Sequence, residues 1–390
     1  MKNLDQYFSV KDFEKKARRR LPNCVYEFIR GGAEDEASLA MNRHAFDDYA
    51  FIPRGLVDVS KRSQAITLWD RQYDSPVGIA PTGLTSIVSY QADRALARQA
   101  VQDKIPYIIS GASNVALETL QEDNQDCWYQ GYFPSNRTRI QAIMDRIERA
   151  GIRVLVVTID TSVGANRENN ARRGFSVPLK LRPSLLLDGA LHPHWATQVF
   201  MRTLLTSGIP RFANFYETIG SPITEDAPHG MRTDRDSLSW DDIEWIRANW
   251  KHRFVLKGVL HPADAERAVK AGLDAIIVSN HGGRQLDGSI SPMRALPQVI
   301  ASVPAGFPVI VDGGFRRGSD VLKAIALGAR MTLIGRPVLY GAAVAGQQGI
   351  ARVIDIFRSE IDRNLALLGC TDINALSRDQ LAFREAAVQA

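Results

Sequence analysis

The sequence predicts a (β/α)8 barrel that forms one domain over residues 1–390. Two observations carry this prediction: eight short, continuously apolar runs recur along the chain, and amphipathic patterns of helical period separate most of them. Continuously apolar runs are typical of strands buried on both faces of a parallel sheet. The expected strands are residues 77–80, 107–110, 128–133, 154–160, 254–258, 275–281, 309–314 and 331–336.

The segments between the expected strands predict the outer helices. Helical patterns cover residues 93–103, 137–150, 262–271 and 319–327. Glycines follow three of these patterns, at Gly151, Gly272 and Gly328, where a helix commonly ends in the left-handed conformation. Strands that alternate with helices in this way favour a barrel over a sandwich or a helical bundle.

Two segments do not fit the regular alternation. Residues 1–75 precede the first expected strand and predict a helical lid with a small pair of strands. The connection between the fourth and fifth strands is unusually long, and residues 161–240 are therefore an insertion in one loop of the barrel. The chain has neither a long Gly/Ser or Pro linker nor a repeat of solenoid period, which favours one elaborated domain.

Composition and charge exclude several classes of protein. With 45% hydrophobic and 23% charged residues, the chain has globular composition, which excludes disordered, collagen-like and coiled-coil proteins. Cys24, Cys127 and Cys370 lie too far apart for a disulfide framework or a metal cluster, which suits a reducing compartment. The first residues lack the apolar core of a signal peptide, and no apolar run approaches the ~18 residues that span a bilayer. We therefore expect the protein on the cytoplasmic side.

The net charge of +5 is concentrated in the insertion. Residues 167–211 contain seven Lys or Arg and two Asp or Glu, together with Trp195, Phe200 and several leucines. Basic residues mixed with Trp, Phe and Leu suit the headgroup layer of an anionic membrane. The alternative is an ordinary buried insertion with a solvated basic rim. Nucleic-acid binding is not supported, because no long basic run or binding motif is present.

The motif V-S-N-H-G-G-R-Q-L-D-G, residues 278–288, carries the strongest chemical signal. It places His281 at the carboxyl end of the sixth expected strand, where barrel enzymes hold their catalytic residues. A histidine can accept a proton near neutral pH, and Arg284 could hold a carboxylate by two parallel hydrogen bonds. This pairing suits proton abstraction from a 2-hydroxy acid. The alternative is a structural histidine in a turn.

Two glycine-rich segments indicate a phosphate site. They are V-D-G-G-F-R-R-G, residues 311–318, and I-G-R-P, residues 334–337, after the seventh and eighth expected strands. Loops at these positions form the common phosphate site of barrels, and Arg316 and Arg336 add positive charge. Turn glycines with solvated arginines are the alternative. The pattern does not separate a phosphate-bearing cofactor from a phosphorylated substrate, so a barrel isomerase remains a second class of function.

A lysine inside a barrel needs an anionic partner. Lys257 ends the fifth expected strand, where a reduced flavin, a Schiff base or a salt bridge to Asp160 would satisfy it. Asp160 could instead orient His281.

His192 and His194 form H-P-H without an evident third ligand, so no metal site is predicted. No G-x-G-x-x-G segment follows an expected strand, so a nicotinamide site is not supported.

The chain resembles the FMN-dependent 2-hydroxy acid dehydrogenases and oxidases over nearly its whole length. The resemblance is carried by Y-E-F-I-R-G-G-A-E-D-E at residues 26–36, by S-N-H-G-G-R-Q at residues 279–285 and by I-G-R-P. It implies that FMN is the cofactor, that His281 is the base and that Asp160 is its partner. It implies substrate contacts from Tyr26, Tyr132, Arg167 and Arg284.

The resemblance also implies which residues hold FMN. Pro81, Thr82 and Gly83 would lie against the N5 edge of the flavin, while Ser110, Gln130 and Thr158 would bond its ring. Lys257 would face N1 and O2, and Ser279 would lie near the ribityl chain. The ribityl and phosphate groups would contact Asp312, Gly314, Arg316, Gly335 and Arg336.

Within this family, the insertion is similar to that of the membrane-associated mandelate dehydrogenases. The similar segments are L-L-L-D-G-A-L-H-P-H-W, residues 185–195, and G-I-P-R-F-A-N-F, residues 208–215. Gly83 is typical of dehydrogenases rather than oxidases, and Ala112 leaves room for an aryl group. The resemblance implies oxidation of (S)-mandelate or a related aryl acid, a membrane quinone as acceptor, a peripheral place on the inner membrane and a homotetramer.

Other functions remain open at this point. An L-lactate dehydrogenase, or a 2-hydroxy acid oxidase that uses O₂, would share the same chemistry. A phosphate-binding barrel isomerase would use Lys257 or His281 on a phosphorylated substrate. A non-enzymatic membrane-binding barrel would have little reason to end nearly every strand in a polar residue or a glycine.

Overall fold

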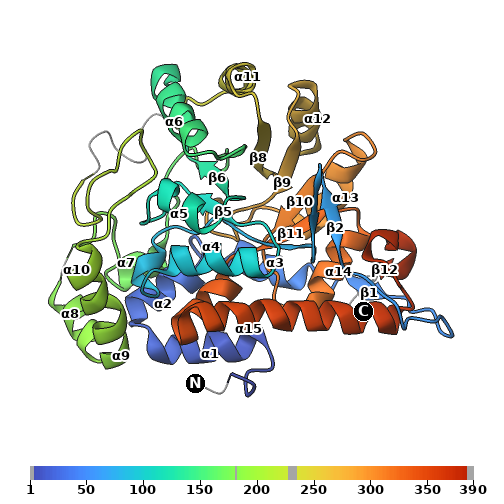
Figure 1. Cartoon of the computed structure of the whole chain (residues 1–390), viewed down its shortest axis with the longest axis horizontal. Helices are drawn as coiled ribbons and strands as arrows, with labels where there is room; N and C mark the ends of the chain where they lie inside the picture. Colours follow the sequence, from blue (N-terminus) through green and yellow to red (C-terminus); the bar gives the residue numbers. More distant parts are fainter. Residues whose placement is uncertain (1–3, 181, 227–234, 384–390) are drawn as a thin grey trace.

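The computed structural model describes residues 4–180, 182–226 and 235–383, and it shows the predicted barrel (Figure 1). Eight parallel strands pair in the order β4-β11-β10-β9-β8-β7-β6-β5, and a bridge between Ile79 and Tyr107 joins the two outer strands. The fold prediction is therefore confirmed. The strands are β4 (Val77–Ile79), β5 (Ile108–Ser110), β6 (Trp128–Gly131), β7 (Val154–Thr158), β8 (Arg253–Val259), β9 (Ala275–Val278), β10 (Val309–Asp312) and β11 (Met331–Ile334).

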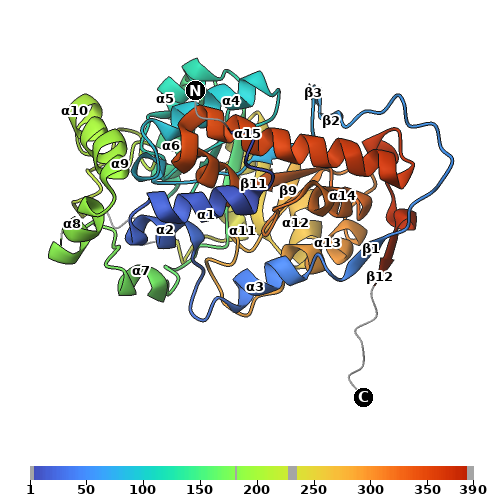
Figure 2. The same cartoon turned by 90° about the horizontal axis from the view of Figure 1, so that it is seen from below.

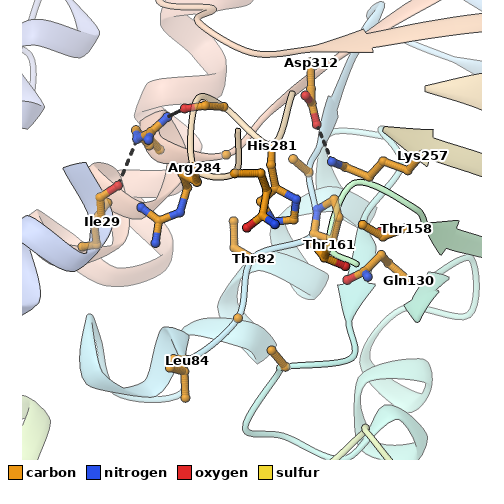
Figure 3. Close-up of a pocket in the computed structure, with 18 of the residues that line it drawn as sticks. Ile29, Thr82, Leu84, Gln130, Thr158, Thr161, Lys257, His281, Arg284 and Asp312 are labelled. Atoms are coloured by element: carbon orange, nitrogen blue, oxygen red, sulfur yellow. Dashed lines mark hydrogen bonds and ion pairs between the residues drawn. The ribbon is translucent and has the colours of Figure 1, made fainter. Parts of the chain in front are cut away.

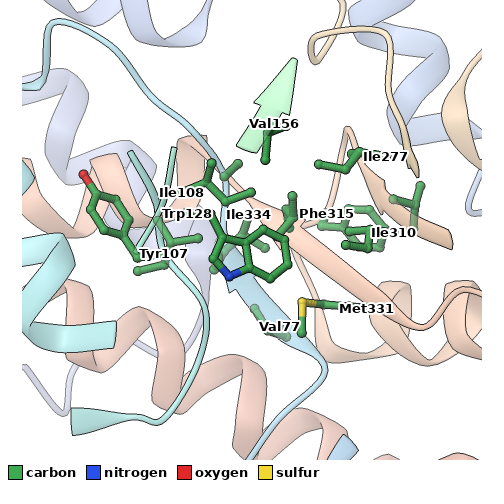
Figure 4. Packing of buried hydrophobic residues seen from close by; sticks show 14 of the residues in the cluster. Val77, Tyr107, Ile108, Trp128, Val156, Ile277, Ile310, Phe315, Met331 and Ile334 are labelled. Carbon is green, nitrogen blue, oxygen red and sulfur yellow. The ribbon is translucent and has the colours of Figure 1, made fainter. Parts of the chain in front are cut away.

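The core forms because these strands are apolar on both faces. Figure 4 shows Val77, Val156, Ile277 and Ile310 of four strands packed around the side chain of Trp128, and all five are at most 2% exposed. Burial of this apolar surface is the main favourable term of folding, at roughly 25 cal/mol per Å².

The outer helices lie where the sequence predicts them. They are α4 (Ala92–Gln102), α6 (Arg137–Arg149), α12 (Pro262–Lys270) and α14 (Gly318–Ala326), joined by α5 (Leu117–Asp123), α11 (Trp240–Asn249) and α13 (Pro292–Ala301). The three predicted stop glycines have positive φ, at 84° for Gly151, 74° for Gly272 and 108° for Gly328. Their use as helix ends is therefore confirmed.

Most of the predicted strands run too far at their carboxyl ends. The sixth ends at Val278 rather than at His281, and the eighth ends at Ile334 rather than at Arg336. The reason is local backbone conformation: His281 has φ of +57°, which is incompatible with a strand. Arg336 instead begins α15 (Arg336–Leu368), which bends at Ala345 and Gly346.

The amino-terminal segment covers both ends of the barrel. It contains α1 (Val10–Arg20), α2 (Asn23–Arg30), α3 (Ala37–His44) and the antiparallel pair β2 (Ile66–Leu68) and β3 (Arg71–Tyr73). In Figures 1 and 2, α1 lies along α15, with which it packs. The β2–β3 hairpin closes the amino-terminal end, since Trp69 Nε1 donates to Asp274 O at 3.2 Å just before β9.

One strand pair was not predicted. Residues 49–51 form β1 (Tyr49–Phe51), which pairs with β12 (Leu381–Phe383) from the far end of the chain. The short helical turns η3 (Ile373–Ala375) and η4 (Arg378–Gln380) precede β12. Local sequence patterns do not predict a pairing between segments so far apart in sequence.

The insertion leaves β7 and forms a group of short helices at one side of the barrel. They are α7 (Glu168–Arg172), α8 (Pro183–Ala190), α9 (Pro193–Trp195), the π-helical turn η2 (Ala196–Met201) and α10 (Arg202–Ser207). Figures 1 and 2 both place α8, α9 and α10 beyond α2, at the edge of the molecule. In the part of the chain that the structure describes, no helix is both long and apolar enough to cross a bilayer.

Candidate active site

A cavity of about 260 Å³ lies at the carboxyl end of the barrel. Residues from strand ends, from the end of α2 and from the insertion line it, and Figure 3 shows His281 between Arg284 and Lys257 in this view. Of the predicted site residues, the lining contains Pro81, Thr82, Gly83, Gln130, Tyr132, Thr158, Arg167, Lys257, His281, Arg284, Asp312, Gly314, Arg316, Gly335 and Arg336.

His281 and Asp160 form a hydrogen-bonded pair beside this cavity. The distance from His281 Nδ1 to Asp160 Oδ1 is 2.9 Å, and both side chains are largely buried. Burial opposes ionisation of Asp160, but His281 and then Lys257 outweigh it and lower the pKa of the carboxyl. Because a carboxylate only accepts, the Nδ1 atom carries the hydrogen and Nε2 has a free lone pair. The pair thus presents a neutral imidazole that can accept a proton.

The environment of His281 favours this neutral state, and its backbone conformation is unusual. Its φ of +57° is rare for a residue with a side chain and costs of order 1–3 kcal/mol, which is typical of functional sites. Burial lowers the pKa of His281 below its usual 6.5, although Asp160 acts in the opposite direction. His281 is therefore mostly neutral at pH 7.

Three guanidinium groups give the cavity a strong positive field. Burial, and then the proximity of Arg167 and Arg336, lower the pKa of Arg284 well below its usual value. Among the described residues, Arg284 forms no ion pair, and its Nη1 donates to the carbonyl of Gly31 at 2.7 Å. Burial likewise lowers the pKa of Arg336 to about 10. Buried charges are stable only with a counter-charge, so this wall is suited to an anion.

The salt-bridge partner of Lys257 is not the Asp160 that the sequence offered as one alternative. Its Nζ lies 3.2 Å from Asp312 Oδ2 and donates to Ser279 Oγ at 2.8 Å, so the salt bridge is to Asp312 and not to Asp160. Burial disfavours the ammonium form, but Asp312 and Asp160 outweigh it and raise the pKa of Lys257. The lysine is therefore charged.

Several buried polar atoms around the cavity have no hydrogen-bond partner among the described residues. They are Thr82 Oγ1, Gln130 Nε2, Thr158 Oγ1 and Asp312 Oδ1. Unpaired buried polar groups cost about 1–3 kcal/mol each, so native structures rarely leave four of them in one place. Donors and acceptors arranged around Lys257 fit the polar edge of a flavin ring.

The glycine-rich loops fit a phosphate group. Gly314 has φ of +89°, and a Cβ atom there would lie 2.3 Å from the carbonyl oxygen of Asn42. Only glycine allows this approach of the loop to the lid. Gly335 caps the amino-terminal end of α15, where backbone N–H groups and the helix dipole favour an anion, and Arg316 and Arg336 line the same part of the cavity.

Besides Asp160, three predicted residues do not line the cavity. Ser110 lies behind Gln130 and donates to its Oε1 at 3.2 Å, and Ser279 lies behind Lys257. Tyr26 is buried against Tyr340, with ring centroids 6.5 Å apart.

The structure also brings in residues that sequence reasoning missed. The guanidinium of Arg235 lies over the Tyr132 ring, 4.8 Å from its centroid, and Phe215 stacks on Tyr132 at 5.8 Å. Both line the cavity, as does Gln285, whose Nε2 donates to the Asp160 carbonyl at 2.9 Å. Gln285 follows Arg284 in the glycine-rich motif, whereas Arg235 lies at the end of the insertion with no pattern to mark it.

The two histidines of the H-P-H segment, His192 and His194, lie in the insertion, outside the cavity. His192 Nδ1 is 2.7 Å from the carbonyl oxygen of Asp188, and His194 Nε2 is 2.8 Å from a nitrogen of Arg20. Within the described ranges, no three His, Cys, Asp or Glu side chains gather as a metal site would require.

Comparisons with known proteins agree with this geometry. The model of the FMN-dependent dehydrogenase family matches residues 17–383. The chain is 40% identical to (S)-mandelate dehydrogenase of Pseudomonas putida, over 96% of this chain and 93% of that protein. It is 37% identical to L-lactate oxidase of Lysinibacillus sphaericus, over 94% and 90% of the two chains.

A solved structure shows the same fold. The crystal structure of the monotopic membrane protein (S)-mandelate dehydrogenase superposes with a TM-score of 0.89 at 38% identity, covering 97% of this chain and 100% of that one. The family match and these relatives confirm the fold and the cofactor class that the sequence predicts. The chain belongs to the FMN-dependent dehydrogenase family and oxidises 2-hydroxy acids with FMN as its cofactor.

Proposed function

We propose that the protein oxidises an (S)-2-hydroxy acid with an aryl side chain, such as (S)-mandelate, to the 2-keto acid and delivers the electrons to a membrane quinone. The single observation that carries the chemical step is the 2.9 Å contact between His281 Nδ1 and Asp160 Oδ1 in a cavity with a wall of guanidinium groups. This arrangement places a base that can accept one proton beside a site that can bind one carboxylate.

The residues around the cavity have separate roles in this reaction. Arg284 and Arg167 bind the substrate carboxylate, and Tyr132 contacts the substrate from the far wall. Nε2 of His281 accepts a proton from the substrate, and Asp160 stabilises the imidazolium that results. The end of α2 and the insertion contribute residues to the walls of the cavity.

When bound, FMN accepts the two electrons that the substrate loses. Lys257, Gln130 and Thr158 would hold the polar edge of its ring, with Ser110 and Ser279 as positioning residues behind them. Pro81, Thr82 and Gly83 would border the ring. Asp312 would hold the ribityl chain, and its phosphate would be held by Gly314, Arg316, Gly335 and Arg336.

One predicted substrate contact lies outside the cavity lining. Tyr26 packs on Tyr340 beside the cavity, and its contact with a bound acid stays a prediction.

The aryl preference is supported by the shape of the cavity. Tyr132 and Phe215 form an aromatic wall, and Ala112 presents only a methyl group on the side of Gly83. A Cβ atom on Gly83 would lie 2.4 Å from Ala112 Cβ, so Gly83 lets these two segments pack closely, and Ala112 adds no more than a methyl group to the wall. The relative at 40% identity is a mandelate dehydrogenase.

Membrane association is supported by the surface of the insertion. Seven of the 18 exposed large hydrophobic side chains among the described residues fall within residues 186–209, and we call them the apolar patch. They are Leu186, Leu187, Leu191, Phe200, Met201, Leu205 and Ile209. Lys180, Arg182, Arg202 and Arg211 are exposed in the same insertion, so apolar and basic groups meet as an anionic bilayer surface requires. The cytoplasmic side of the inner membrane and the homotetramer stay predictions.

Anaerobic mixing tests the substrate assignment. Purified protein is mixed with (S)-mandelate, or with L-lactate, while the visible flavin band is followed. We expect fast bleaching by mandelate and slow bleaching by lactate. Bleaching by lactate alone would move the substrate to the alternative, and a stoichiometric yield of hydrogen peroxide in air would make the protein an oxidase.

A further inference from the structure

A second cavity, which we call the insertion cavity, lies outside the active site. It has a volume of about 320 Å³ and is enclosed by α8, α9, η2 and α10 of the insertion, by α2 and by η1 (Thr85–Ile87). Its described lining residues include no charged side chain, and most are Leu, Val, Ile, Phe, Ala or Pro. Cavities of this size hold small molecules, and this lining is suited to an apolar one.

The insertion cavity and the active-site cavity share their walls. Leu84 lines the active site and Ile87 lines the insertion cavity, three residues further along the same segment (Figure 3 labels Leu84). The rings of Phe28 and Phe175 are in contact, with centroids 4.5 Å apart and planes tilted by 30°; the first lines the active site and the second the insertion cavity. Trp195 Nε1 donates to the Ile87 carbonyl at 2.7 Å, which ties the insertion to the segment that follows the flavin-bordering residues.

One polar group lines this cavity without a partner. Thr203 is 7% exposed, and its Oγ1 has no hydrogen-bond partner among the residues that the structure describes. The other lining hydroxyl, Ser86 Oγ, is satisfied by Asn114 Oδ1 at 2.6 Å. An unpaired buried hydroxyl destabilises the protein, so Thr203 indicates a ligand that supplies a hydrogen-bonding atom.

The insertion cavity is also continuous with the apolar patch. Leu186 and Met201 line the cavity and are nevertheless 57% and 46% exposed. A ligand dissolved in the bilayer would therefore meet the opening of this cavity where the patch contacts the membrane.

We propose that the insertion cavity binds the ring of a lipophilic quinone, with Thr203 Oγ1 donating a hydrogen bond to one quinone carbonyl. The proposal deepens the proposed function and rests on it. The hydroxy acid loses its Cα–H and O–H bonds and gains a C=O double bond. The two electrons and two protons end on the quinone oxygens as a quinol. A lipid acyl chain would fill the same apolar volume but would leave Thr203 unpaired, so the observations favour the quinone.

The test measures binding of a benzoquinone with a ten-carbon chain to the oxidised, FMN-loaded protein by calorimetry. Ala196→Phe fills the insertion cavity, and Gln198→Phe adds the same ring at an exposed position of η2 as the matched control. We expect Ala196→Phe to weaken quinone binding at least about 10-fold, because the added ring occupies the ligand's volume. Gln198→Phe should leave the Kd unchanged. Equal Kd values for the two variants would overturn the proposal.

Thr203→Val tests the polar contact independently of the filling variant. It should weaken quinone binding about 5-fold while raising the Tm of the quinone-free protein, because the unpaired hydroxyl is removed. A higher Tm with an unchanged Kd would make Thr203 a structural residue only and would contradict the assigned hydrogen bond.

Two further readouts separate the possible failures. The rate of flavin reduction by hydroxy acid should be unchanged in Ala196→Phe and Thr203→Val. If no hydroxy acid reduces the flavin of the unmodified protein, the proposed function is wrong, whereas the proposed quinone site is not contradicted by that result. If Ala196→Phe lowers binding to quinone-free anionic vesicles but not to the quinone, the cavity holds a lipid chain and the proposal is wrong.

Discussion

Asp160 Oδ1 and His281 Nδ1 lie 2.9 Å apart although the two residues are 121 positions apart in the sequence. They meet because β7 and β9 flank β8 in the barrel, so that the loops after these strands converge at one edge. The contact fixes which imidazole nitrogen carries the hydrogen, and the positive φ of His281 fixes the backbone behind it. Both features favour the proposed proton uptake at Nε2.

The pH dependence should report on His281. Because burial lowers its pKa below the usual 6.5 and the neutral form is the proposed base, kcat/KM should fall on the acid side with a midpoint below pH 6.5. Asp160→Asn removes the charge that raises this pKa, so the midpoint should move further to acid. It should also lower kcat at least about 100-fold, because the imidazolium loses its counter-charge. An unchanged pH profile in Asp160→Asn would show that another group titrates.

Arg284 should not tolerate replacement by lysine. Arg284→Lys keeps the charge but loses the planar fork that binds a carboxylate by two hydrogen bonds, so KM should rise and kcat/KM should fall about 10- to 100-fold. The matched control is Arg294→Lys, because Arg294 also makes a two-point contact, with Asp48, but lies at the surface. Steady-state kinetics that change equally in both variants would argue against a substrate contact at Arg284.

Lys257 and Asp312 should behave as a coupled buried pair. Lys257→Met leaves Asp312 buried without its counter-charge, which should lower the free energy of unfolding by about 3–5 kcal/mol. The double variant Lys257→Met with Asp312→Asn should recover most of this loss, and neither variant should retain FMN tightly. Urea unfolding and bound-flavin absorbance measure the two effects. A double variant as unstable as Lys257→Met would show that the pair is not the source of the loss.

The apolar patch should control membrane binding. Leu191→Ser with Leu205→Ser removes two leucines that are 70% and 80% exposed on the insertion, so binding to anionic vesicles should fall at least about 10-fold. Leu56→Ser with Leu367→Ser removes two leucines elsewhere that are 110% and 68% exposed, and it should leave vesicle binding unchanged. Flavin reduction by hydroxy acid should be the same in all of these proteins. Equal loss of binding in both pairs would point to nonspecific adhesion.

The structure limits how much of the insertion can be deleted. A deletion of residues 181–212 would remove Phe212, which is buried and lines the active site, and residue 181 lies outside the described residues. Removing residues 184–209 spares Phe212, and we expect the shortened protein to stay in the soluble fraction and to be reduced by hydroxy acid.

Local pattern predicted the barrel and most of the site, since apolar runs mark buried strands and His281, Arg284 and the glycines sit in short motifs. Three features could not be predicted in this way. The pairing of β1 with β12 and of Lys257 with Asp312 depends on segments that only the closed barrel brings together. Arg235 reaches Tyr132 from the end of the insertion, where no repeat or motif fixes the path of the chain.

The most direct test of the account is the rate of flavin reduction by (S)-mandelate in single-turnover, anaerobic mixing of the unmodified protein and of His281→Asn. Asparagine tolerates the positive φ at this position, so the loop and FMN binding should be preserved while the base is lost. We predict bound FMN in both proteins and a reduction rate at least about 100-fold lower in His281→Asn. Equal rates in the two proteins would contradict the assignment of His281 as the base.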